Sequence, residues 1–137
     1  MSANEVFLGF DPGRDKCGVA VVDRQGRIYE HRVVLAQESV TYLGLLLERY
    51  AIARLIMGNQ TTSKSWQSEL EAVLPKEISI VLVDERNSSL EARDRYWQMY
   101  PPQGLKKLIP QGMRLPPVPI DDIVAILLIE RYLADLI

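Results

Sequence analysis

Acidic residues at the ends of separate apolar segments are the side chains in this sequence that could do chemistry. Asp11 ends a short apolar run, Glu85 follows a later one, and Asp121 and Asp122 open the last predicted helix. If these carboxylates converge, they repel one another strongly unless a cation neutralises them. Oxygen ligands without histidine or cysteine favour Mg²⁺ or Mn²⁺. Two such ions roughly 3.5–4 Å apart would stabilise the attacking water and the leaving oxygen in a phosphodiester cleavage.

Each of these acids also has a purely structural interpretation. The Asp-Pro-Gly sequence that begins at Asp11 is typical of a turn that closes a hairpin. Asp121 and Asp122 could complement the dipole of the helix that they open. Glu85 could pair with a surface arginine, and only one of Asp84 and Glu85 can face the site if the strand continues through them. The pattern as a set, rather than any single acid, indicates a metal site.

The elements that must position the acids are predicted from apolar runs, helical spacing and breaking residues. Strands are expected at residues 5–11, 17–23, 27–34, 54–57 and 78–83, and helices at about 38–50, 63–73, 88–99 and 120–136. Three antiparallel hairpin strands followed by alternating helices and strands indicate an α/β fold with a five-stranded mixed sheet flanked by helices. Such sheets bind their ligands beyond the carboxyl ends of the parallel strands, so the acids are expected at that edge.

Turns and caps give more local predictions. Gln25-Gly26 predicts the hairpin turn between the second and third strands. Ser88 or Ser89 is expected to cap the helix that follows Glu85, and Ser88 has Glu91 three residues later, which is the spacing of a capping box.

The stretch from Pro101 to Pro119 contains six of the eight prolines, so it can be neither a regular helix nor a central strand. We therefore expect a long loop before the C-terminal helix, and long loops in compact domains are usually functional or disordered. No Asp or Glu occurs from Arg95 to Ile120, and three aromatic residues stand at the start of this segment. Aromatic rings can stack on exposed bases. The alternative is that these rings face the core while the lysines decorate a mobile loop.

Basic and polar side chains near the acids or in this loop are the candidate contacts to a nucleic-acid backbone. Arg14 and Lys16 flank the first acid and could hold the backbone at the point of cleavage. The full set comprises Arg14, Lys16, Thr61, Lys64, Arg86, Lys106, Lys107 and Arg114.

Composition limits the class of protein. The 137 residues suit one domain, and 47% hydrophobic with 25% charged residues are ordinary globular values. Cys17 is the only cysteine and His31 the only histidine, which excludes an internal disulfide and a multi-histidine zinc site. Both residues are expected to be structural.

The apolar run at 123–129 is too short to cross a bilayer, and no secretory signal is evident, so a cytoplasmic location is expected. The net charge of −2 means that nucleic-acid binding must depend on local patches.

Three segments together resemble a known family. LGFDPGRDKCGVAVVD at the start, VDERNSSLEARDRYW in the middle and IDDIVAILLIERYL near the end resemble, in order and spacing, the motifs of the YqgF group, also called RuvX. This group is related to the RuvC Holliday-junction resolvases in the RNase H-like superfamily. The resemblance implies a single RNase H-like domain over residues 1–137.

The resemblance also implies the chemistry. Asp11, Glu85 and Asp121 would be the catalytic acids that bind Mg²⁺ or Mn²⁺, with Asp122 as the alternative to Asp121. The substrate would be four-way DNA junctions or precursor ribosomal RNA, cleaved by a monomer or a weak homodimer with no membrane association.

One departure from the family keeps other functions open. RuvC-type resolvases carry an acid at the end of the fourth strand, where this chain has Asn59, so Glu85 must substitute. The leading hypothesis is a metal-dependent nuclease. The alternatives are a non-catalytic module that binds nucleic acid or protein, and a single-lobe ATPase-like phosphate binder.

Overall fold

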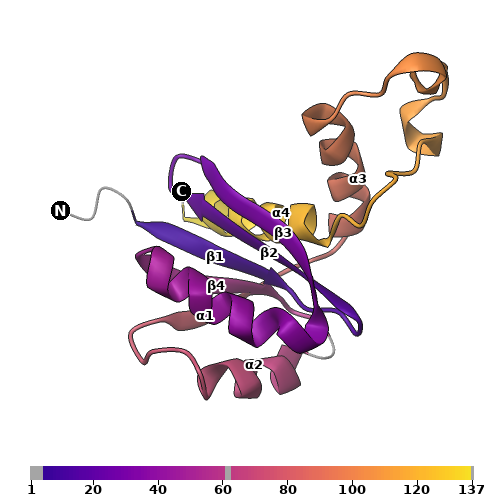
Figure 1. The fold of residues 1–137 in the computed structure, drawn as a ribbon. Coiled ribbons are helices and arrows are strands. Elements are labelled where there is room, and N and C mark those ends of the chain that lie inside the picture. Colours follow the sequence, from indigo (N-terminus) through magenta and orange to yellow (C-terminus); the bar gives the residue numbers. More distant parts are fainter. Residues whose placement is uncertain (1–4, 61–62, 137) are drawn as a thin grey trace.

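The computed structural model describes residues 5–60 and 63–136, and its centre is a five-stranded sheet with strand order β3-β2-β1-β4-β5 (Figure 1). The strands are β1 Val6–Asp11, β2 Lys16–Asp23, β3 Ile28–Leu35, β4 Ile52–Gly58 and β5 Ser79–Val83. β1, β2 and β3 pair antiparallel, whereas β4 pairs parallel with both β1 and β5. The predicted mixed α/β sheet is therefore confirmed.

Helices cover both faces of the sheet (Figure 1). Helices α1, Ser39–Arg49, and α2, Ser63–Glu71, lie on one face. Helix α4, Asp121–Asp135, lies on the other face, and α3, Ser88–Met99, packs against α4. No helix within the described ranges is long and apolar enough to cross a membrane.

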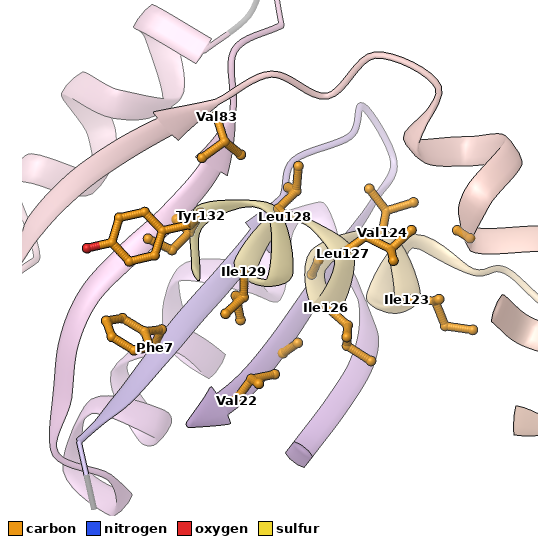
Figure 2. Close-up of a cluster of buried hydrophobic side chains, with 14 residues drawn as sticks. Phe7, Val22, Val83, Ile123, Val124, Ile126, Leu127, Leu128, Ile129 and Tyr132 are labelled. Carbon is orange, nitrogen blue, oxygen red and sulfur yellow. The ribbon is translucent and has the colours of Figure 1, made fainter. Parts of the chain in front are cut away.

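The core divides in two because strand side chains alternate between the two faces of the sheet. Figure 2 shows the α4 side, where α4 packs over Phe7 of β1 and Val22 of β2. Every residue of α4 from 123 to 129 is buried. A Cβ atom at Gly9 would lie 2.4 Å from the carbonyl oxygen of Ala125, so glycine is what lets α4 lie directly on β1.

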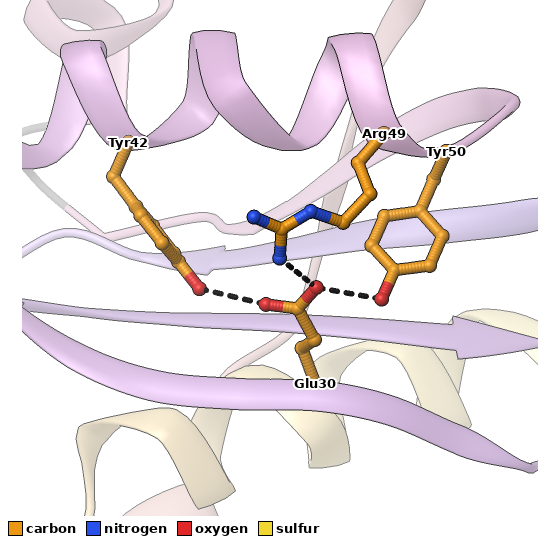
Figure 3. Close-up of polar contacts among 4 residues, drawn as sticks. All are labelled: Glu30, Tyr42, Arg49 and Tyr50. Atoms are coloured by element: carbon orange, nitrogen blue, oxygen red, sulfur yellow. Dashed lines mark hydrogen bonds and ion pairs between the residues drawn. The ribbon is translucent and has the colours of Figure 1, made fainter.

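A carboxylate fixes α1 to the edge strand β3 (Figure 3). Glu30 of β3 accepts hydrogen bonds from the hydroxyl of Tyr42 at 3.0 Å, the guanidinium of Arg49 at 2.5 Å and the hydroxyl of Tyr50 at 2.6 Å. Burial alone would raise the pKa of Glu30, but these three donors outweigh burial and lower the pKa. The charge of Glu30 is thus part of the contact between α1 and the sheet.

The β2–β3 turn forms where Gln25-Gly26 predicts it. Gly26 has a φ of +88°, which glycine adopts without strain. The Asp23 side chain closes the turn by accepting hydrogen bonds from the backbone N–H groups of Gln25 and Arg27.

The capping prediction for α3 is wrong. The N-cap is Asn87, in the left-handed conformation with φ of 61°, and Ser88 is already the first helical residue. Glu91 pairs with Arg131 of α4 instead of closing a capping box. Asparagine tolerates the left-handed conformation better than most residues, and this turn redirects the chain from β5 into α3. Helix α2 also ends at Glu71, two residues before the predicted end.

The segment between α3 and α4, residues 100–119, extends away from the sheet (Figure 1). It contains two short 3-10 helices, Gly104–Leu108 and Gln111–Met113, and is otherwise irregular, as its prolines predict. We refer to residues 100–119 as the arm.

Candidate active site

Asp11 lies at the carboxyl end of the central strand β1, on the face covered by α4. Phe7 belongs to the α4 side of the core, and the alternation of side chains places Gly9 and Asp11 on the same face. Asp11 pairs with Gly18 of β2. On its other side, β4 ends at Gly58, one residue beyond the partner of Phe10.

The glycines on these two neighbouring strands make room for two further acids. A Cβ atom at Gly18 would lie 1.9 Å from the carbonyl oxygen of Asp121, so the first residue of α4 lies directly on β2. A Cβ atom at Gly58 would lie 2.9 Å from Oε2 of Glu85, so this carboxylate lies on the end of β4. Asp121 and Glu85 therefore flank Asp11 from the two adjacent strands, on the same face of the sheet.

The negative charges are close enough to perturb one another. Burial, together with the carboxylates of Asp121 and Glu85, raises the pKa of Asp11 to about 7. Burial and Asp122 raise the pKa of Asp121, and nearby Lys16 offsets part of this increase. Burial, followed by repulsion from Asp84, raises the pKa of Glu85. Repulsion of this kind is relieved by protonation or by a cation.

The donor set fits a hard divalent cation. Its oxygen atoms come from Asp11, Glu85 and Asp121, and carboxylate oxygens are the ligands that Mg²⁺ and Mn²⁺ prefer. Across residues 5–60 and 63–136, no three His, Cys, Asp or Glu side chains form a group ready to hold a metal ion. The fit therefore depends on the chemistry and the accumulated charge of the acids.

Asp122, the alternative ligand, is engaged elsewhere. Its Oδ2 lies 2.6 Å from Nδ1 of His31, and its Oδ1 accepts a hydrogen bond from the backbone N–H of Ile123. Of the two neighbouring residues Asp121 and Asp122, it is Asp121 whose carboxylate repels Asp11. The structure thus brings Asp121, and not Asp122, beside the other two acids.

His31 is the neighbour of the site that sequence reasoning missed. It lies on β3 opposite Ala20, and it therefore shares a face with Gly18 and the start of α4. The pattern of alternation along β2 and β3 could have placed it there, but only once the pairing of the two strands was known.

The candidate backbone contacts form two groups. Arg14 and Lys16 are exposed near Asp11, and Lys64 is exposed on α2. Arg86 follows Glu85 but is exposed in a hollow that it shares with Arg131 and Asp135 near the C-terminal end of α4. Thr61 lies outside the described residues. A further link in this region joins the loop after β4 to the β1–β2 turn, since the side-chain amide of Gln60 donates a hydrogen bond to the carbonyl oxygen of Pro12.

The second group lies on the arm. Lys106 and Lys107 are exposed on its first 3-10 helix. Arg114 instead holds the arm together, because its Nε donates to the carbonyl oxygen of Ile109 and its guanidinium lies over the ring of Trp97 at 5.4 Å. Arg95 makes a bidentate ion pair with Glu130, in which each terminal guanidinium nitrogen donates to one carboxylate oxygen.

The remaining aromatic and sulfur-containing side chains behave mostly as core residues. Trp97 is buried, whereas Tyr100 is 47% exposed. Trp66 packs edge-on against Phe10, and Cys17 is buried.

Comparison with known proteins gives a family and a fold. The family model RuvX, described as Holliday junction resolvase, matches residues 5–135. Among solved structures, "T. thermophilus RuvC in complex with Holliday junction substrate" is 18% identical, with a TM-score of 0.50 and coverage of 91% of this chain and 90% of that chain. A second structure, "Thermus thermophilus RuvC structure", is 18% identical, with a TM-score of 0.49 and coverage of 90% and 89%. No curated protein matches. At 18% identity the first likeness shows a shared fold, which is the RNase H-like fold that the motifs imply.

Proposed function

This chain belongs to the RuvX family, and from that premise we propose that it is a metal-dependent nuclease that hydrolyses phosphodiester bonds in structured nucleic acid. The observation that carries the proposal is the gathering of carboxylates around a buried Asp11: burial first, and then the charges of Asp121 and Glu85, raise its pKa to about 7. Nothing in the packing of the sheet requires three acids at one edge, and their mutual repulsion opposes folding. Such an arrangement is typical of a site whose charge is used in chemistry.

Asp11, Glu85 and Asp121 would hold Mg²⁺ or Mn²⁺. A divalent cation bound there would supply the chemistry that activates a water molecule and stabilises the leaving oxygen of the cleaved bond. The protein supplies the position of the acids: the rigid end of β1 fixes Asp11, Gly58 admits the Glu85 carboxylate, and Gly18 admits the start of α4.

The exposed basic residues around the acids would hold the substrate backbone. Arg14 and Lys16 lie in and just after the β1–β2 turn, and Arg86 follows Glu85 directly. Contacts of this kind fix the position of a nucleic acid without reading its sequence. Because the net charge is −2, attraction to a nucleic acid would depend on these local basic groups and on the lysines of the arm.

The substrate we propose is a four-way DNA junction, because the matching family model is described as a Holliday junction resolvase. Structured precursor RNA is the alternative substrate, since the phosphodiester chemistry is the same for both. Side-by-side assays on junction DNA, linear duplex of the same sequence and structured RNA distinguish them.

The test is cleavage of these substrates in Mn²⁺ or Mg²⁺ by the native protein and by Asp11→Asn. We expect the native protein to cut the junction in preference to the duplex, and Asp11→Asn to fall to the metal-free background. Asp135→Asn, at the exposed far end of α4, is the matched control and should cleave normally. Metal-dependent activity that survives in Asp11→Asn would refute the proposed role of this acid.

A non-catalytic binding module is the second candidate. Two observations favour it. Asn59 stands where RuvC-type resolvases carry an acid, and no three acidic, histidine or cysteine side chains among the described residues are grouped closely enough to hold a metal ion. Tight binding of the junction without any turnover in Mn²⁺ would support this candidate over the nuclease.

A further inference from the structure

A hollow of about 220 Å³ lies beside the acids and takes no part in the chemistry proposed above. Tyr96 of α3 and Tyr100, the first residue of the arm, form one wall, and His31 of β3 with Asp122 of α4 forms another. Ile123 of α4 and residues at the end of the arm complete the lining.

The hollow opens next to the candidate active site. Asp122 is the immediate neighbour of Asp121, which lies against Gly18 and flanks Asp11. A second hollow of about 440 Å³ adjoins the first at Pro119 and is lined by Lys16. A backbone held by Lys16 would therefore pass both the acids and the mouth of the smaller hollow.

The walls combine flat apolar faces with a polar edge. The rings of Tyr96 and Tyr100 lie 5.1 Å apart and are inclined by 41°, and Tyr100 is 47% exposed. Within residues 5–60 and 63–136, neither tyrosine hydroxyl has a hydrogen-bond partner. The imidazole of His31 uses Nδ1 to pair with Asp122, which leaves its Nε2 edge for a ligand.

These features match one part of a nucleic acid. A nucleobase has an apolar face that stacks on aromatic rings and a polar edge that forms hydrogen bonds. Pockets that hold drug-sized ligands usually measure about 300–1,000 Å³, so a hollow of about 220 Å³ favours a smaller group such as a single base.

We propose that the pocket formed by Tyr96, Tyr100, His31 and Asp122 receives one unstacked nucleobase next to the cleaved phosphate. The inference rests on the proposed function and adds to it, because it predicts that the substrate must present an unpaired or easily unpaired base at a fixed distance from the cut. Branch points and loops provide such bases, whereas continuous duplex does not.

The test couples a change in the protein to a change in the substrate. Four-way junctions are prepared with a single abasic site at successive positions around the crossover, and their affinity is measured in metal-free buffer, where nothing is cut. With the native protein, removing the base that occupies the pocket should weaken binding by about tenfold at one position. With Tyr100→Ala, the intact junction should bind about tenfold more weakly, and the same abasic site should add less than about twofold.

Two controls separate stacking from misfolding. Tyr100→Phe keeps the ring and should retain the sensitivity to the abasic site. Leu90→Ala removes an exposed side chain at the other end of α3 and should behave as the native protein.

Equal effects of every abasic site on the native protein and on Tyr100→Ala would overturn the pocket proposal, even if the protein cleaves junctions normally. Conversely, the native protein could fail to cleave junctions in Mn²⁺ or Mg²⁺ while one abasic site weakens its binding and has little effect on Tyr100→Ala. That result would overturn the nuclease proposal alone. The two failures are therefore distinguishable.

Discussion

At the scale of residues, Asp11 lies between two glycines, Gly18 on β2 and Gly58 on β4, and each glycine admits another acidic residue. The start of α4 occupies the space that a side chain at Gly18 would fill, and the Glu85 carboxylate occupies the space beside Gly58. The two sites differ in what a methyl group would meet. At Gly18 it would meet backbone, whereas at Gly58 it would meet the side chain of Glu85, from its Oε2 atom to its Cβ atom.

Gly58→Ala should therefore impair cleavage without unfolding the protein. The new Cβ atom would lie 2.9 Å from Oε2 and 3.1 Å from Cδ of Glu85, so this carboxylate must move away from Asp11. We expect a cleavage rate at least tenfold lower, because small displacements of catalytic groups cost that much. The free energy of unfolding should fall by about 1–3 kcal/mol, the usual cost of adding a methyl group to a tight contact, and the protein should stay folded.

The matched control is Gly44→Ala on α1, where a Cβ atom meets nothing within 4 Å. This change should stabilise the helix by roughly 0.5–1 kcal/mol and leave cleavage unchanged. Normal cleavage by Gly58→Ala would show that the position of Glu85 does not matter for activity.

The raised pKa of Asp11 predicts how stability changes with pH. The pKa is about 7 in the folded protein, compared with an ordinary value of 3.8, so the folded state holds the proton more strongly. The free energy of unfolding should therefore fall as the pH rises from 5 to 8, by roughly 2 kcal/mol for this group. Asp11→Asn has no charge at this position, so the variant does not lose stability as the pH rises. It should therefore be more stable than the native protein at pH 8.

Urea denaturation in metal-free buffer at pH 5 and pH 8 measures this difference. Native protein and Asp11→Asn with the same dependence on pH would contradict the raised pKa that burial and repulsion from Asp121 and Glu85 together produce.

The acids could be predicted from the sequence because each stands at the end of an apolar run. The preference for Asp121 over Asp122 came from the family motif and agrees with the position of Asp121 beside Asp11. The roles of Gly18 and Gly58 could not be predicted in this way. They depend on which residues lie opposite one another in the sheet, and that information appears only in the strand pairing.

At the scale of elements, Glu30 is the polar anchor between β3 and α1. It accepts hydrogen bonds from two tyrosine hydroxyls and one guanidinium, and its side chain is 23% exposed. Beside this anchor, Tyr29 of β3 packs edge-on against Tyr50, with ring centroids 5.9 Å apart, so polar and aromatic contacts together fix how the helix lies on the sheet.

Glu30→Gln should lower the free energy of unfolding by about 1–2 kcal/mol at pH 7, since hydrogen bonds to a charged acceptor are stronger than those to an amide. The folded-state pKa is lowered from 4.5, so the charged form contributes stability above this value. The contribution is lost as the pH falls through the folded pKa, and the difference from the native protein should disappear in acid.

Thermal or urea denaturation from pH 3 to pH 7 checks this prediction. The control is Glu48→Gln, at an exposed position on α1, which should have little effect on the free energy of unfolding. A constant difference between native protein and Glu30→Gln over the whole pH range would show that packing, and not charge, explains the loss.

The existence and order of the elements could be predicted from apolar periodicity, but their ends could not. Ser88 matches the sequence pattern of a cap, yet the chain turns at Asn87, because the left-handed residue there links β5 to a helix that packs on α4. Helix α2 ends at Glu71, and the following residues form a tight turn on Leu70. Tertiary packing decides such boundaries, and a local pattern does not contain it.

At the scale of the whole molecule, the arm joins α3 to α4 and extends away from the sheet (Figure 1). Its large apolar residues are unusually exposed, with Leu105 at 82% and Leu108 at 79%. Lys106 and Lys107 lie between them and are exposed. The prolines predicted an irregular segment, but the sequence alone did not indicate that it projects from the core.

Changing Lys106 and Lys107 together to alanine should weaken binding to every nucleic acid tested to a similar degree. If both lysines contact phosphates, the slope of log affinity against log salt should fall by about 2, roughly one for each lost contact. Fluorescence anisotropy at several salt concentrations measures this slope. Lys76→Ala, an exposed lysine between α2 and β5, is the control. An unchanged slope in the double variant would show that the arm does not contact the backbone.

We propose that Asp11, Glu85 and Asp121 share one divalent cation, and calorimetric titration of Mn²⁺ into the protein near pH 8, without nucleic acid, measures this binding. The native protein and Asp135→Asn should bind Mn²⁺ equally, and Asp11→Asn and Glu85→Gln should each lose this binding. Binding of Mn²⁺ by Asp11→Asn with native affinity would show that these acids do not form a cation site.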